Sequence, residues 1–358
     1  MKYVFASLGM VGALGACVVA EAEDTTAVAL TGTRCDLWGC GANSASVGDG
    51  ILFDELDWSG RELNKSGTVI LGAYSQYGTP VQLRVERHEL YAVALDGSRE
   101  YHNSDLLGTI VKLKHPTATF ELRIDGVDQQ SLEFWSGVTE AVPSYLIRAR
   151  TTSNDGFKEL ICKNNVVGED PRWASAPNNA IAFQWDRYDA PSKTVYADPS
   201  STWFNLACAG TTPAKLHLQR HTEAGAYLAN GKRAYPTSLA QRQTLLKMFT
   251  ADFCGNGTSY TADGTPLWYL NASGTMSNAF VWPTPTRATG EAIWNAWGAV
   301  CLDTPRRDPW NRNMIDCASV LPSCGTMGGW GANGYIASGI PSTVPIPSTV
   351  LMAWPPSP

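Results

Sequence analysis

Residues 250–266, TADFCGNGTSYTADGTP, have the spacing of a calcium-binding loop. Ligand positions 1, 5, 6 and 12 of such a loop are occupied by Asp252, Asn256, Gly257 and Asp263. Position 3 is Cys254, and a thiol is too soft a ligand for a hard cation that requires oxygen. Gly and Pro follow where an exit helix should begin, which favours a turn and a strand. The sequence therefore predicts a disulfide-anchored turn after a helix, and we expect no metal and no cofactor.

The pair His217 and His221 is the second arrangement that could bind a metal. On a helix, residues four apart share a face. Here Leu216 and Leu218 alternate with polar residues, which indicates a strand instead. On a strand the two imidazoles would stand roughly 13 Å apart, too far to share one ion. We therefore predict solvent-facing strand histidines.

The N-terminal residues 1–22 have the layout of a secretory signal. One Lys precedes a short apolar run that ends in small residues, and the run is too short to span a bilayer. LGAC at 14–17 resembles a bacterial lipobox, which makes Cys17 the expected lipid attachment site. The alternative is ordinary cleavage after Ala20 or Ala22. We expect an exported protein, either an outer-membrane lipoprotein or a periplasmic or extracellular protein.

Eight of the nine cysteines remain once Cys17 is set aside, and an even number in an exported chain indicates a disulfide framework. Short separations are the easiest to close in an unfolded chain. We therefore predict the bridges Cys35–Cys40 and Cys317–Cys324. The full set of candidates is Cys35, Cys40, Cys162, Cys208, Cys254, Cys301, Cys317 and Cys324.

Composition narrows the class of partner. The formal net charge is -6, and Lys and Arg are spread thinly along the chain, so we expect no basic patch and no nucleic-acid partner. Contact with a membrane is expected through the lipid anchor only. Thirteen Trp could form an exposed binding face, although most are expected in the core, such as Trp185 in alternation with Ile181 and Phe183. The expected partner is a cell-envelope polymer or protein.

Residues 30–164 are predicted to form a β-rich domain. Apolar and polar residues alternate with period two in segments separated by Gly, Pro and Asn, which favours an antiparallel sandwich-like or barrel-like sheet. The predicted strands are VQLRVER (81–87), TIVKLKH (109–115), FELRID (120–125), SYLIRAR (144–150) and KELICKN (158–164).

Turn formers at 165–179 indicate a boundary, followed by an α+β domain at 180–324. Its main helix is SLAQRQTLLKMF (238–249), where Ser238 and Gln241 have the spacing of a capping box. The expected strands are AIAFQWDRY (180–188), TWFNLACAG (202–210) and AKLHLQRH (214–221). Residues 325–358 are rich in Gly, Pro and Ser and lack apolar periodicity, so we expect a flexible tail.

The segment LLKMFTADFCGNGTSYTADGTPL is similar to the signature of the bacterial ADYC-domain proteins, an exported family without an assigned activity, with Phe253 in place of the Tyr. FNLACAG with Cys208 and EAIWNAWGAVCLDTPR with Cys301 resemble the family's opening and closing strands, so the resemblance covers about 200–307. The family usually has cysteines where Leu216 and Leu245 stand. Their joint loss suggests that these leucines are packed neighbours; the alternative is two ordinary core leucines.

These observations favour a mainly β, disulfide-bonded protein of the cell envelope that acts as a binding or structural module. The alternative is a secreted hydrolase whose site is assembled from distant residues. Paired carboxylates, or a nucleophile within reach of a histidine, would favour the enzyme, whereas an exposed aromatic stripe would favour the module.

Overall fold

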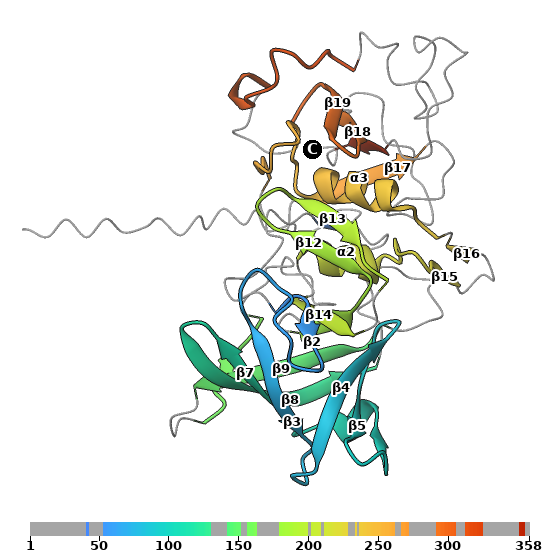
Figure 1. The fold of residues 1–358 in the computed structure, drawn as a ribbon. Coiled ribbons are helices and arrows are strands. Elements are labelled where there is room, and N and C mark those ends of the chain that lie inside the picture. Colours follow the sequence, from blue (N-terminus) through green and yellow to red (C-terminus); the bar gives the residue numbers. More distant parts are fainter. Residues whose placement is uncertain are drawn as a thin grey trace, which may run out of the picture.

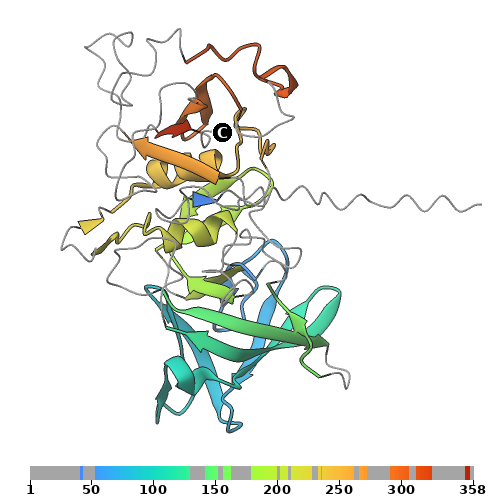
Figure 2. The same ribbon diagram turned by 180° about the vertical axis from the view of Figure 1, so that it is seen from behind.

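The computed structural model describes residues 41–42, 53–129, 142–151, 156–162, 179–199, 202–208, 211–227, 233–234, 236–261, 266–271, 291–305, 312–324 and 351–354. Within them the protein is mainly β, as the sequence predicts. One large antiparallel sheet fills the lower half of Figure 1, and two helices with a smaller sheet fill the upper half. Figure 2 shows the same division from behind. No described helix has the length and apolar character that a membrane crossing requires.

The large sheet has the strand order β2-β14-β11-β9-β8-β7-β3-β4-β5-β6, with β10 also paired to β9. Its strands are β2 (Leu56–Asp57), β3 (Val69–Tyr74), β4 (Pro80–Glu86), β5 (Glu89–Ala94), β6 (Glu100–Tyr101), β7 (Ile110–His115), β8 (Ala118–Asp128), β9 (Ser144–Thr151), β10 (Glu159–Leu160), β11 (Asn179–Phe183) and β14 (Trp203–Cys208). A 3-10 turn, η1 (Asn103–Leu106), follows β6.

Alternation along each strand decides which residues enter the core. On β4, Val81, Leu83 and Val85 are buried, while the residues between them remain partly exposed. Adjacent β5 is in antiparallel register, so Leu83 lies opposite Ala92 and both are buried. The period-two pattern in the sequence is therefore confirmed for these strands.

Strand β11 is buried on both faces because it separates two cores. Ala180 and Ala182 belong to the core enclosed by the large sheet. Ile181 and Phe183 point the other way, into the core built around the helices. The positive φ of 81° at Trp185 then breaks the alternation, and Trp185 is half-buried instead of joining this second core.

The second core is covered by helices and by three smaller groups of strands. The helices are α2 (Thr212–Leu218) and α3 (Leu239–Phe249). The five-stranded sheet has the order β1 (Gly41–Ala42), β17 (Pro266–Asn271), β20 (Leu351–Trp354), β18 (Ala292–Asn295) and β19 (Gly298–Leu302). Two hairpins, β12 (Asp186–Asp189) with β13 (Thr194–Ala197) and β15 (Ala226–Tyr227) with β16 (Arg233–Ala234), and the 3-10 turn η2 (Arg312–Met314) complete the described elements.

Helix α3 begins as predicted. The Ser238 hydroxyl accepts a hydrogen bond from the Gln241 amide at 3.2 Å, and the Gln241 side chain accepts one from the Ser238 amide at 2.8 Å. This reciprocal pair satisfies two backbone groups that a helix start leaves without partners.

The prediction of a strand at 214–221 is wrong, because Thr212–Leu218 form helix α2. Pro213 lies in the first helical turn, where its fixed φ and missing amide hydrogen favour a helix start. All seven residues of the helix are buried, so the alternation of Leu216 and Leu218 with polar residues does not mark a solvent-facing side. The period-two pattern here arose from a helix that is enclosed on all sides.

The predicted boundary and tail lie largely outside the described residues. Strands β11 and β14 follow the boundary at 165–179 in the sequence, yet they belong to the same sheet as β3–β9. The division into two domains therefore stays a prediction. Within the predicted tail, Leu351–Trp354 form β20, which is hydrogen-bonded to β17 on one side and β18 on the other.

Candidate functional site

The first candidate region is the signature loop, defined here as residues 250–261 after α3. Its Asp252 is fully buried and forms an ion pair with Lys247, with 2.6 Å between Nζ and Oδ2. The same carboxylate oxygen accepts a hydrogen bond from the Gly257 amide at 2.9 Å. Lys247 also donates to the Ser192 carbonyl at 2.8 Å. The Asp252 carboxylate thus holds the loop against α3, and Lys247 of α3 also contacts the β12–β13 hairpin.

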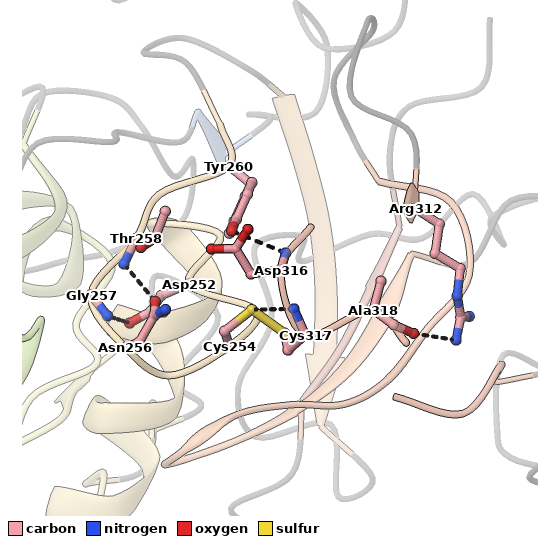
Figure 3. The surroundings of a disulfide bond; sticks show 10 residues. All are labelled: Asp252, Cys254, Asn256, Gly257, Thr258, Tyr260, Arg312, Asp316, Cys317 and Ala318. Atoms are coloured by element: carbon pink, nitrogen blue, oxygen red, sulfur yellow. Dashed lines mark hydrogen bonds between the residues drawn. A yellow bond between two sulfur atoms is a disulfide. The ribbon is translucent and has the colours of Figure 1, made fainter. Parts of the chain in front are cut away.

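A disulfide joins the signature loop to a segment far along the chain. Cys254 is bonded to Cys317, and the Cys317 amide lies 3.2 Å from the Cys254 sulfur (Figure 3). Beside it, the Tyr260 hydroxyl accepts a hydrogen bond from the Asp316 amide at 3.3 Å. The prediction of a disulfide-anchored turn leaving the helix is therefore confirmed, and so is the strand that follows, β17.

Phe253 fills the inner side of the signature loop. Its ring stacks on Trp294 with 4.9 Å between centroids and lies 5.9 Å from the Tyr260 ring. Its carbonyl accepts a hydrogen bond from the Ala299 amide at 2.9 Å. These contacts attach the loop to the β18–β19 hairpin, and they place an aromatic ring where no solvent reaches it.

Two glycines allow the loop to approach its neighbours closely. Gly255 has φ of +70°, and a Cβ there would lie 1.8 Å from the Trp297 carbonyl oxygen. Gly257 has φ of +88°, and a Cβ there would lie 2.0 Å from the Pro191 carbonyl oxygen. Only glycine satisfies both the backbone conformation and the available space.

The second candidate region is a buried group of polar side chains that we call the histidine cluster. It connects the β4–β5 turn of the large sheet to α2, α3 and the β12–β13 hairpin. Its members are His88, Asp186, Tyr188, His217, Arg220 and Arg242, all buried.

The histidine cluster is connected by a chain of hydrogen bonds in which each group can donate to the next, from Arg220 to Asp186. Arg220 donates to His88 Nδ1 at 3.4 Å, and His88 Nε2 lies 3.0 Å from His217 Nδ1. His217 Nε2 in turn lies 3.5 Å from the Tyr188 hydroxyl, which is hydrogen-bonded to Asp186. All contacts are satisfied together when both imidazoles are neutral and carry their hydrogen on Nε2.

Electrostatics favour the same neutral state. Burial lowers the pKa of His88 to about 3, and the Arg220 charge adds to this effect. Burial also lowers the pKa of His217 well below its usual value. Asp186 faces Arg242, whose Nη2 donates to Oδ1 at 2.9 Å; burial raises the pKa of Asp186 and the guanidinium opposes that shift. At neutral pH the histidines therefore do not carry charge.

His221 belongs to a neighbouring group. Its Nε2 lies 2.7 Å from the Tyr269 hydroxyl, which donates to the Gln219 side chain. Burial lowers the pKa of His221 to about 3. The prediction that His217 and His221 face solvent is therefore wrong, because α2 and the turn after it are enclosed by β11, α3 and β17.

The described cysteines form three disulfides, Cys162–Cys208, Cys254–Cys317 and Cys301–Cys324. The predicted bridge Cys317–Cys324 is therefore wrong. The Arg312 guanidinium donates to the carbonyls of Leu302, Ala318 and Leu321. It thereby holds 312–324 as a compact turn, with Cys317 bonded to the signature loop and Cys324 bonded to β19. Cys17, Cys35 and Cys40 lie outside the described residues, so the Cys35–Cys40 bridge stays a prediction.

The sequence does not identify the histidine cluster as a whole. His88 and His217 are 129 residues apart, and neither stands in a motif. One signal is visible: Arg242 lies in the apolar stripe of α3, and a charged residue at such a position is seldom buried without a partner. That partner is Asp186.

A family model described as the ADYC domain matches residues 103–308, which is more than half of the chain. The match includes the signature loop and every member of the histidine cluster except His88. No curated protein and no solved structure matches the chain.

Proposed function

Because the chain belongs to the ADYC domain family and the signature loop is engaged in contacts inside the molecule, we propose that this protein is a binding or structural module of the cell envelope. The observation that carries the proposal is that three side chains of the signature loop are engaged inside the molecule. Asp252 forms an ion pair with Lys247, Cys254 forms a disulfide with Cys317, and the Phe253 ring stacks on Trp294. None of these three side chains is therefore available to a ligand. A loop with these contacts stabilises a scaffold, and the binding surface lies elsewhere.

Three disulfides fit an extracellular or periplasmic protein. The proposal adds a lipid anchor on Cys17, which rests on the sequence LGAC at 14–17. In this form the module is tethered to a membrane by its N-terminus.

The hydrolase is the weaker alternative. In the described part of the chain all members of the histidine cluster are buried, and the hydrogen-bond partners of its imidazoles are an Arg, a Tyr and each other. A histidine does meet a hydroxyl where His115 Nδ1 lies 2.8 Å from Thr117 Oγ1. That pair belongs to the exposed β7–β8 turn, and the Thr117 amide also donates to the same nitrogen at 3.4 Å, so the contact stabilises the turn.

The anchor is tested by replacing Cys17 with Ser and measuring partition between membranes, detergent phase and soluble fraction. We expect the wild type in the membrane fraction and Cys17→Ser in the soluble fraction. A wild type that is fully soluble, with a mature N-terminus at Glu21 or Glu23, contradicts the anchor.

The module is tested by incubating the purified protein with cell-wall polymers and with generic ester, peptide and glycoside substrates. Turnover that purification does not remove would favour the hydrolase.

A further inference from the structure

The outward surface of β7, β8, β9 and the turn before β10 collects positive charge. These strands lie side by side in the large sheet (Figure 1), and their inward residues form its core. The outward residues include six cationic side chains, which we call the cationic face. Its members are Lys112, Lys114, Arg123, Arg148, Arg150 and Lys158.

Register, not sequence proximity, creates this surface. Arg123 on β8 lies opposite Arg148 on β9, and Glu121 lies opposite both Lys112 and Arg150. Side chains directly opposite one another in an antiparallel pair project to the same side. Spacing along the chain does not reveal this grouping, because residues far apart in the sequence are brought together by the pairing of the strands.

Among the described residues, Asp125 and Glu121 form ion pairs with these cations, and each is shared by two of them. Asp125 pairs with Arg123 and with Arg148, the latter at 3.1 Å. Glu121 pairs with Arg150 at 2.6 Å and with Lys112 at 3.7 Å. Asp128 follows near the end of β8. Within the described residues of this face, the six cations outnumber the three acids Glu121, Asp125 and Asp128, although the whole chain has a net charge of -6.

Two guanidiniums are held against one aromatic ring. The Arg123 and Arg150 guanidinium carbons lie 4.4 Å and 4.3 Å from the centre of the Phe157 ring. Each is oriented by its acidic partner through Nε and Nη2. In the described part of the chain no hydrogen bond engages Nη1 of either arginine. Positioned guanidiniums with free donors, gathered at one surface, are suited to carboxylate or phosphate oxygens.

We propose that the cationic face binds an anionic polysaccharide of the cell envelope. This inference rests on the proposed function as a binding module and names its partner class. The charge complements a repeating carboxylate polymer, and the extended sheet surface offers several contacts along one chain. The face of a sheet lacks the helix or ribbon that reads base edges in a DNA groove, so a polysaccharide is favoured over nucleic acid. Each contact is weak, and the attraction decreases with salt.

The experiment measures binding of the folded, disulfide-bonded protein to polygalacturonate by co-sedimentation and by affinity electrophoresis. Neutral dextran of similar size is the polymer control. We expect retention by polygalacturonate that weakens at least tenfold between 50 and about 300 mM salt, and no retention by dextran. Retention by duplex DNA or by phosphatidylglycerol vesicles with none by polygalacturonate would overturn the choice of partner.

Two variants locate the site. Arg123→Gln with Arg150→Gln should weaken polymer binding about tenfold or more, whereas Arg99→Gln, which removes an exposed charge elsewhere, should leave it unchanged. The arginine variant could lose binding because it no longer folds, and Lys114→Glu is a second variant that avoids this ambiguity. Lys114 is exposed and is not part of an ion pair described above. Lys114→Glu should therefore weaken binding without altering thermal stability. Equal binding by wild type and Lys114→Glu, with the arginine pair variant folded and fully bound, overturns the proposal. The anchor on Cys17 is measured separately, so either idea can fail alone.

Discussion

Gly255 lies against the carbonyl oxygen of Trp297, so close that a Cβ would stand 1.8 Å from that oxygen. The contact joins the signature loop to the β18–β19 hairpin. Trp297 itself is 80% exposed, so the tight contact involves its backbone and not its ring.

Replacing Gly255 with Ala should destabilise the protein on the order of 3 kcal/mol or more, because the positive φ and the clash act together. Gly78 is the matched control, with φ of +79° and nothing within 4 Å of its Cβ position. Gly78→Ala should lose only about 1 kcal/mol. Denaturant unfolding of both variants decides the matter, and equal losses would show that the close contact is unimportant.

The effects of replacing Lys247 and Asp252 on the free energy of unfolding should be strongly coupled. Removing the cation in Lys247→Met leaves a buried carboxylate without its partner, which costs about 3–5 kcal/mol. Adding Asp252→Asn removes that charge while keeping an oxygen for the Gly257 amide. We therefore expect the double variant to be more stable than Lys247→Met. A double-mutant cycle measures the coupling energy, and strictly additive losses would contradict it.

Stability should fall in mild acid. In the unfolded chain histidines take up protons below a pKa of about 6.5, whereas burial holds the pKa of His88 and His221 at about 3 and lowers that of His217 strongly. The unfolded state therefore binds more protons. Asp54 and Asp186 act in the opposite direction, because burial raises the pKa of both carboxyls, that of Asp54 to about 6, and the folded state gains these protons first. Between pH 6 and 5 we expect a net loss of about 2–3 kcal/mol per pH unit.

Two variants should move this pH slope in opposite directions. His221→Gln removes one of the three histidines, so the free energy of unfolding should depend less on pH. Asp54→Asn removes one of the opposing carboxyls, so the dependence should become steeper. Denaturant unfolding at several pH values gives both slopes. If neither variant changes the slope, other groups control the acid sensitivity.

Leu216 and Leu245 stand where the resemblance to ADYC-domain proteins implies cysteines, and we expect the two leucines to be packed neighbours. Both are fully buried, on helices α2 and α3, which contact each other in the second core. The double replacement Leu216→Cys with Leu245→Cys should oxidise on export and add no titratable thiol in denaturant. Either single replacement should add one thiol. Leu218→Cys with Leu245→Cys is the control, because Leu218 lies on another side of α2, and it should add two.

Local patterns predicted the strands that alternate between buried and exposed residues, and they predicted helix α3 from the capping box in its first turn. Alternation in β4 and β8 and the capping box of α3 were sufficient, since each is decided within a few residues. The same pattern failed for α2, because a helix buried on all sides has no polar face to reveal its period of 3.6. Pro213 was the local signal that favoured a helix.

The candidate regions depend on pairings that no local pattern contains. Cys254 and Cys317 are separated by 63 residues. A bridge from Cys317 to Cys324 closes a shorter loop and loses less entropy in the unfolded chain, but the folded structure places Cys317 beside Cys254 instead. The cationic face has the same origin, because Arg123 and Arg148 meet through strand register. Both the disulfide pairing and the cationic face therefore depend on tertiary structure, which local sequence patterns do not contain.

The position of β20 has a consequence for the order in which the protein can assemble. Leu351–Trp354 lie between β17 and β18, although both of those strands leave the ribosome much earlier. Until β20 arrives, β17 and β18 each have an open edge on the side that β20 will occupy, and open edges recruit other strands. Completion of this sheet is therefore a late event in synthesis, and a nascent chain interrupted before residue 351 would be prone to aggregate through those two edges.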